Sequence, residues 1–157
     1  MVGPMERVDT DPDDFLEAFA DESVRTTMQR LDQIIRAALP GRNRTLWEGV
    51  FWGGTDQSIL GYGDIVQPRP KGETVEWFLV GLARQKDSYS LYVNAVEDGA
   101  YIGQGYADRL RAAGVAKSRV KIGSASIGFG FLDDVDVEVL AELLGRADEL
   151  TPPDERS

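Results

Sequence analysis

The side chains available for chemistry in this 157-residue chain are carboxylates, hydroxyls, lysines, arginines and aromatic rings, because it contains no cysteine and no histidine. Without imidazole or thiolate groups, the sequence excludes Ser-His-Asp hydrolysis, thiol catalysis and metal sites that depend on these ligands. A hard cation held by oxygen atoms alone is the metal chemistry that remains open. No tightly bound cofactor is expected.

Carboxylates gather in two clusters, one near each end of the chain. The first imitates the start of a calcium-binding loop, but Asp14 and Ala20 stand where that loop needs Gly and Glu, so we interpret it as a helix start. The second cluster predicts a site for weakly held iron or another hard cation, with helix capping as the simpler interpretation. Its members are Asp133, Asp134, Asp136 and Glu138.

Three basic residues, Lys117, Arg119 and Lys121, alternate along an expected strand and would therefore share one face. This pattern predicts an anion-binding surface, joined by Arg109 or Arg111. The favoured interpretation is a charged edge strand that discourages aggregation, which is a routine feature of sheets.

Most of the aromatic residues fall in the part of the chain expected to form the sheet. Strand alternation predicts that Trp77 and Phe78 face opposite sides, so not all rings can lie in the central core. Core packing is the favoured interpretation of these aromatic residues, and a ligand site lined by some of them is the alternative. A buried Glu48 beside them would be a candidate general acid or base. The candidate pocket residues are Trp47, Glu48, Tyr62, Trp77, Lys121 and Ser126.

Capping residues and apolar spacing predict two helices before the sheet. Asp11-Pro12-Asp13-Asp14 is typical of a helix start, because Asp caps helices, Pro fits the first turn and acids favour the positive end. Apolar residues then recur at helical spacing from about Ser23 to Leu39, and Pro40-Gly41 is expected to end this second helix.

Segments rich in aromatic and β-branched residues predict an antiparallel meander, since only short turns separate them. The expected strands are Thr45–Trp52, Ser58–Ile65, Thr74–Ala83 and Tyr89–Val96. They are followed by a partly helical segment around Ala107–Ala113, an extended segment Val120–Leu132 and a last helix Asp133–Leu150. The prediction is an α+β two-layer domain, with a meander of about five strands packed by two N-terminal helices and a C-terminal helix.

One domain is expected over residues 11–150, with a flexible N-terminus over residues 1–10 and a disordered tail over residues 151–157. The net charge of −10 disfavours binding to nucleic acid. The longest apolar run, Trp77–Ala83, is too short to span a membrane, and the first residues lack a signal-peptide pattern. We therefore expect a cytoplasmic protein, either a monomer or a homodimer.

The order of several segments resembles the YdhG-like domain-of-unknown-function family over roughly residues 12–148. The matching segments are Leu46-Trp47-Glu48-Gly49, Gly61-Tyr62-Gly63, Trp77–Leu82, Ser90-Leu91-Tyr92, Lys121–Ile127 and Leu132–Leu140. The resemblance implies an α+β fold with an antiparallel sheet, and some members act as frataxin-like iron chaperones. Many members carry a cysteine where Ala125 or Ser126 stands here, and the family supplies no established catalytic residues.

Three functions are compatible with these observations. The preferred one is a non-catalytic intracellular protein that binds iron or a small ligand. The second is a protein interaction module that forms a homodimer through a sheet edge or an aromatic patch. The third is a carboxylate-based enzyme that uses Glu48.

Overall fold

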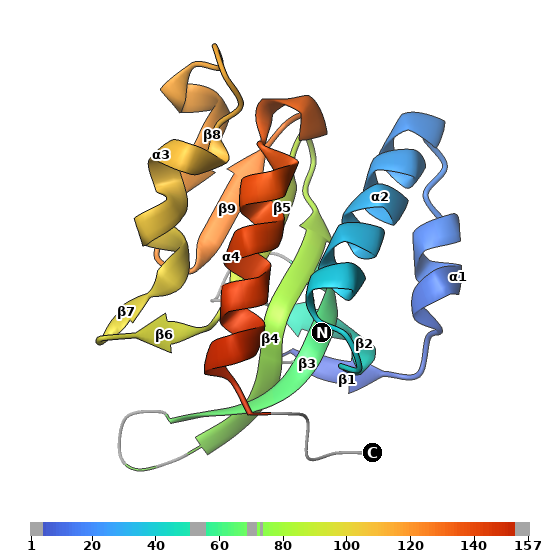
Figure 1. Ribbon diagram of the computed structural model, residues 1–157. Helices are drawn as coiled ribbons and strands as arrows, with labels where there is room; N and C mark the ends of the chain where they lie inside the picture. Colours follow the sequence, from blue (N-terminus) through green and yellow to red (C-terminus); the bar gives the residue numbers. More distant parts are fainter. Residues whose placement is uncertain (1–4, 51–55, 69–71, 73, 153–157) are drawn as a thin grey trace.

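Figure 1 shows the computed structural model, which describes residues 5–50, 56–68, 72 and 74–152. Helices pack on an antiparallel sheet, as predicted for an α+β two-layer domain. The main sheet has seven strands in the order β1-β2-β3-β4-β5-β9-β8, two more than expected, and β6 and β7 form a separate ribbon. Among the described residues, no helix has the length and apolar character needed to cross a membrane.

Acidic N-caps fix where the longer helices begin. The Asp11 carboxylate accepts hydrogen bonds from the backbone of the first turn of α1, at 2.8 Å from the Asp13 nitrogen, as predicted. Asp21 caps α2 in the same way, so this helix begins slightly earlier than expected, and Asp136 caps α4. The four α-helices of the described chain are α1 (Pro12–Glu17), α2 (Glu22–Ala38), α3 (Ala107–Leu110) and α4 (Val137–Leu150).

The predicted meander is confirmed, since four consecutive strands form three antiparallel pairs, each between neighbours along the chain. These strands are β2 (Arg44–Val50), β3 (Asp56–Pro68), β4 (Thr74–Arg84) and β5 (Tyr89–Val93). The pair β6 (Val96–Glu97) and β7 (Ala100–Tyr101) turns away from the sheet, so β5 ends before the predicted Val96.

Two predictions about the remaining strands were wrong. The expected continuous segment Val120–Leu132 is a hairpin of β8 (Val120–Ile122) and β9 (Ser126–Phe129), because the Gly123 nitrogen bonds back to the Ser126 carbonyl and closes a turn. The hairpin attaches to β5 through β9. Residues 6–8, expected in a flexible segment, form β1 (Glu6–Val8) beside β2.

The end of α4 is held in place by hydrogen bonds from Arg42, which lies just before β2. The Arg42 Nη1 and Nη2 atoms donate to the carbonyl oxygens of Pro152 and Thr151, each at 2.9 Å. The first two residues of the predicted disordered tail are therefore bonded to the fold, and residues 153–157 lie outside the described residues.

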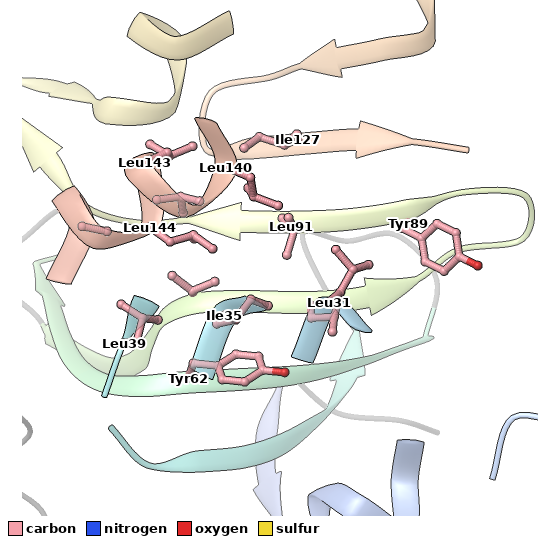
Figure 2. Packing of buried hydrophobic residues seen from close by; sticks show 14 of the residues in the cluster. Leu31, Ile35, Leu39, Tyr62, Tyr89, Leu91, Ile127, Leu140, Leu143 and Leu144 are labelled. Carbon is pink, nitrogen blue, oxygen red and sulfur yellow. The ribbon is translucent and has the colours of Figure 1, made fainter. Parts of the chain in front are cut away.

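The large core lies between the helices and one face of the sheet. Figure 2 shows Leu31 and Ile35 of α2 and its C-cap residue Leu39 beside three leucines of α4, Leu140, Leu143 and Leu144. All of them face strand residues that include Leu91 and Ile127. Each of these side chains is at most 2% exposed. Burying one such side chain contributes roughly 1.5–3 kcal/mol, which explains why the apolar stripes determine the layer order.

A second, smaller cluster lies on the opposite sheet face and consists of Trp47, Ile59, Phe78 and Ala83. Trp77 packs against this cluster and stacks on Phe78 with 4.4 Å between ring centroids. The prediction that these two rings face opposite sides is therefore wrong. Strand alternation breaks in β4, because the next two residues, Leu79 and Val80, both join the large core.

Glycines make room for the Phe78 ring. A Cβ atom on Gly81 would lie 2.5 Å from the Phe78 Cε1 atom, and one on Gly61 would lie 2.8 Å from its Cβ atom. Real Cβ atoms do not approach so closely, so any side chain at either position would displace the ring.

Candidate functional site

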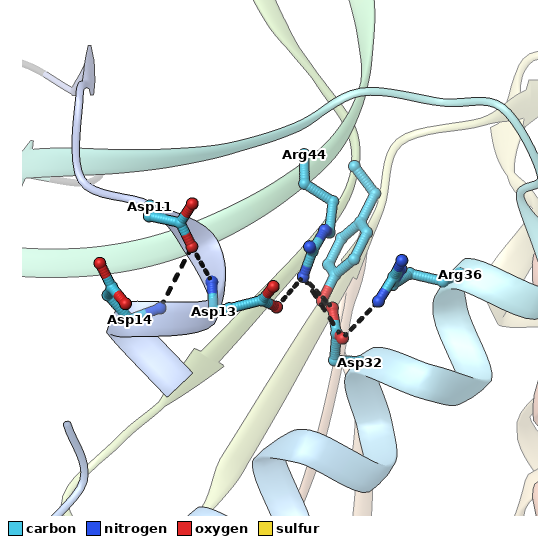
Figure 3. Close-up of polar contacts among 7 residues, drawn as sticks. Asp11, Asp13, Asp14, Asp32, Arg36 and Arg44 are labelled. Carbon is cyan, nitrogen blue, oxygen red and sulfur yellow. Dashed lines mark hydrogen bonds and ion pairs between the residues drawn. The ribbon is translucent and has the colours of Figure 1, made fainter. Parts of the chain in front are cut away.

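A buried carboxylate on α2 organises the polar site shown in Figure 3. Asp32 lies on the same stripe of the helix as Met28 and Ile35, and only 4% of its surface is exposed. Its oxygens accept a hydrogen bond from the Tyr62 hydroxyl at 2.7 Å and another from Arg44 Nη1 at 3.2 Å. Both interactions compensate for the burial of a charge.

Arg44, the first residue of β2, joins α1 and α2 to the sheet. Its Nη1 atom donates to the Asp13 carboxylate of α1 at 3.0 Å as well as to Asp32 of α2. The hydrogen bond from Arg44, followed by its charge, holds the pKa of Asp13 below its usual range. The position of the Arg44 guanidinium is thus fixed from two helices.

The Tyr62 hydroxyl is a neutral donor under ordinary conditions. Burial, followed by the negative charge of Asp32, raises its pKa well above the ordinary value. Tyr62 was predicted as a pocket residue because of its aromatic ring, whereas its contact with Asp32 comes from the hydroxyl group.

The raised pKa predicts how alkali weakens the fold. Above about pH 10 the unfolded chain loses the Tyr62 proton while the folded protein keeps it, so stability falls as the pH rises, by at most about 1.4 kcal/mol per pH unit. We expect Tyr62→Phe to lose stability less steeply than the wild type when urea unfolding is measured between about pH 9 and about pH 11.5. Parallel profiles would contradict this result.

A groove opens beside this network, between the C-terminal half of α2 and the start of β2. Its volume is about 590 Å³. We call it the arginine groove, because three guanidinium groups, two amides and the Tyr62 phenol supply its polar wall, while no carboxylate side chain of the described residues lines it. The polar side chains are Gln33, Arg36, Arg42, Asn43, Arg44 and Tyr62.

The three arginines have different roles. Arg42 is committed to the end of α4, where its Nε donates to Asp148 at 2.8 Å and its Nη atoms donate to backbone carbonyls. Arg44 uses only Nη1, and within the described residues its Nε and Nη2 atoms have no hydrogen-bond partner. The Arg36 side chain is 54% exposed and its described contact is an ion pair with Asp32 at 3.7 Å. Arg36 and Arg44 therefore offer donors to a ligand.

The predicted aromatic pocket is not formed by the six residues proposed for it. Trp47 and Trp77 pack together in the small cluster, with 5.2 Å between ring centroids. Glu48 is exposed and accepts a hydrogen bond from Ser58, so the burial that the enzyme hypothesis requires is absent. Lys121 and Ser126 lie on β8 and β9, at the other end of the sheet.

The second acidic cluster is distributed among structural roles. Asp134 pairs with Arg119 at 3.2 Å, and Asp136 caps α4, as one interpretation predicted. Asp133 lies in the short 3₁₀ helix before this cap, and Glu138 lies in the first turn of α4. In the part of the chain that the structure describes, no three acidic side chains are arranged to hold a metal ion. Iron binding stays a prediction.

The basic triplet is arranged differently from the prediction. Lys117 and Arg119 lie in a 3₁₀ helix, η3 (Lys117–Arg119), so strand alternation does not apply to them. Arg119 and Lys121 nevertheless line one groove. Arg109 and Arg111 do not join it, because they pair with Glu142 and Asp108, respectively.

No protein-family model, no characterised protein and no solved structure matches the chain. The family resemblance therefore stays a prediction. Sequence reasoning missed Asp32, Arg36 and Arg44 as site residues, although one signal pointed to the first of them. A charged residue on the apolar stripe of a helix must find partners when that stripe is buried.

Proposed function

We propose that this protein is a non-catalytic binding protein that holds a small anion in the arginine groove. The observation that carries the proposal is the composition of the polar wall. Among the described residues it has three arginines and no carboxylate, although the chain as a whole has a net charge of −10. Carboxylates pair with these arginines from outside the lining, so the preference for an anionic ligand rests on the guanidinium donors that remain unused and not on a net positive charge.

The free donors of Arg44 are suited to this role. The guanidinium is a planar fork that bonds two oxygens of a carboxylate or phosphate at once, and two of its three nitrogens have no described partner. Asp13 and Asp32 fix its position before a ligand arrives, which lowers the entropy cost of binding. Arg36 would add a second, more mobile cation from the neighbouring helix face.

The chemistry of the wall favours holding an anion over transforming it. Its arginines keep their charge in neutral water and its phenol keeps its proton, so these groups donate hydrogen bonds without exchanging protons with a ligand. The carboxylate nearest to the groove, Asp32, is buried and already accepts bonds from Tyr62 and Arg44.

Calorimetric titration with inorganic phosphate and with acetate tests the proposal. We expect wild-type protein to bind at least one of these anions and Arg36→Gln to weaken that binding by about tenfold, which corresponds to about 1.4 kcal/mol. Arg44→Gln should weaken it at least as much, because its donors are more completely ordered.

A matched control separates a specific site from general charge attraction. Arg30 is an exposed residue of the same helix that does not line the groove, so Arg30→Gln removes the same charge and should change the affinity less than about twofold. Equal weakening by Arg30→Gln and Arg36→Gln, or no detectable heat with either anion, would refute the proposal. Arg36→Gln is informative even if Arg44→Gln unfolds, because Arg36 is exposed.

A further inference from the structure

A second groove lies at the opposite end of the sheet, where β9 and β8 follow β5. Its volume is about 420 Å³. We call it the edge groove. The side chains that give it chemical character are Asp87, Ser118, Arg119, Lys121, Phe131 and Asp134. None of them belongs to the arginine groove, so the two sites are independent.

An exposed aromatic ring forms part of this groove. Phe131 is 65% exposed, and among the described residues only two other large apolar side chains, Val66 and Val96, are more than half exposed. The Arg119 guanidinium lies over the ring, with its Cζ atom 5.8 Å from the centroid. A ring and a guanidinium placed together provide a surface on which another flat ring can stack.

Two cations beside this ring have donors available. Arg119 is anchored through Nε, which donates to the nearly buried Asp134 at 3.2 Å, and its Nη atoms have no hydrogen-bond partner within the described residues. Lys121 is exposed, and it forms no ion pair with any of the residues that the structure describes. Asp134 therefore holds the Arg119 guanidinium in place, while the Lys121 ammonium group is available to bind the carboxylate of a ligand.

Glycines leave the floor of the groove open. Gly128 of β9 pairs in register with Lys121 of β8, so a side chain added there would project from the same sheet face as the lysine. A Cβ atom at Gly128 would lie 3.9 Å from its nearest described neighbour, which is ordinary contact. The space above the strand is thus free for a ligand, and a substitution can fill it without disturbing the backbone.

We infer that the edge groove binds a small aromatic carboxylate. Its ring stacks beside Phe131 and the Arg119 guanidinium, and its carboxylate accepts hydrogen bonds from Lys121 and the Arg119 Nη atoms. The two cations of the groove, Arg119 and Lys121, are matched by two lining carboxylates, so net charge alone does not favour an anion. A ligand therefore needs both an aromatic ring and a carboxylate to bind there. The ring distinguishes this ligand from the simple anion of the arginine groove.

Titration with naphthoate, followed by calorimetry and NMR, tests this assignment. We expect Lys121→Gln to weaken naphthoate binding by about tenfold, because a charge-assisted bond is lost. Phe131→Ala should weaken it by about threefold to tenfold through lost stacking. Gly128→Val should remove detectable binding while the melting temperature stays close to that of the wild type.

Three comparisons make the result decisive. Lys117→Gln removes the same charge from a lysine outside the groove and should leave the affinity nearly unchanged. Arg36→Gln should also leave it unchanged, which separates this site from the arginine groove. Cyclohexanecarboxylate, which lacks a flat ring, should bind at least about threefold more weakly. Absent naphthoate binding, equal loss in Lys117→Gln, or equal affinity for cyclohexanecarboxylate would overturn the inference.

Discussion

Replacing Asp32 by alanine will lower the free energy of unfolding by about 3–5 kcal/mol, the range expected when one partner of a buried ion pair is removed. The substitution leaves the buried Tyr62 hydroxyl without its acceptor and removes one of the two negative partners of Arg44, the buried one. Urea or guanidinium unfolding at neutral pH measures the loss.

Matched variants show whether burial causes this effect. Asp13→Asn removes another acidic partner of Arg44, but the Asp13 side chain is 63% exposed, so the loss should stay below about 1 kcal/mol. In a Tyr62→Phe background, Asp32→Ala should cost less than it does alone, since no phenol is left unpaired. If the free energy of unfolding of Asp32→Ala stays within about 1 kcal/mol of the wild-type value, the contacts of Asp32 with Tyr62 and Arg44 do not stabilise the fold as proposed.

Truncating Phe78 to alanine will cost about 3–5 kcal/mol, and it will lower the penalty of adding a methyl group at Gly81. In the wild type, a Cβ atom at Gly81 would lie 2.5 Å from the Phe78 ring and 2.8 Å from Ile59 Cγ2, so Gly81→Ala should cost about 1–3 kcal/mol. With the ring gone, Ile59 is the close contact that remains and it has vacated space to move into, so Gly81→Ala should cost clearly less than it does in the wild type.

A double-mutant cycle measured by denaturant unfolding checks this coupling. Gly128→Ala is the matched control, because an added Cβ atom there has no neighbour closer than 3.9 Å and should be neutral or slightly stabilising. Additive losses for Gly81→Ala and Phe78→Ala would show that the two positions do not compete for the same space.

Local patterns were sufficient to predict the layers of the fold. The Asp11 cap, the apolar stripe of α2 and the alternation of strand segments with short connections each act over a few neighbouring residues, and the cap, the helix and the antiparallel strand pairs were confirmed. Predictions failed where a long-range contact decides the outcome. Trp77 and Phe78 share one face of β4, and Leu79 and Val80 share the other, which are two departures from alternation that the regular strand pattern does not reveal.

The candidate sites were harder to predict, because they join residues that are distant in the sequence. Tyr62 was chosen for its ring, but its partner Asp32 is thirty residues away on a helix. Lys121 was chosen as part of a basic strand, but its groove partner Arg119 reaches it from a 3₁₀ helix. Composition identified the available chemistry, and only the tertiary structure places it.

The pairing of β5 with β9 has a consequence for how the two grooves can diverge. Between β5 and β8, residues 94–119 leave the main sheet, and the entropy of closing a loop rises only logarithmically, by about 0.6 kcal/mol for each doubling of its length. Arg119 is the last residue of this connection and Lys121 lies in β8 directly after it, so insertions at exposed turns of the connection can reshape the edge groove with a small entropic penalty. The connection that lines the arginine groove, residues 39–43 between α2 and β2, is far shorter, so ligand preference can change more readily at the edge groove.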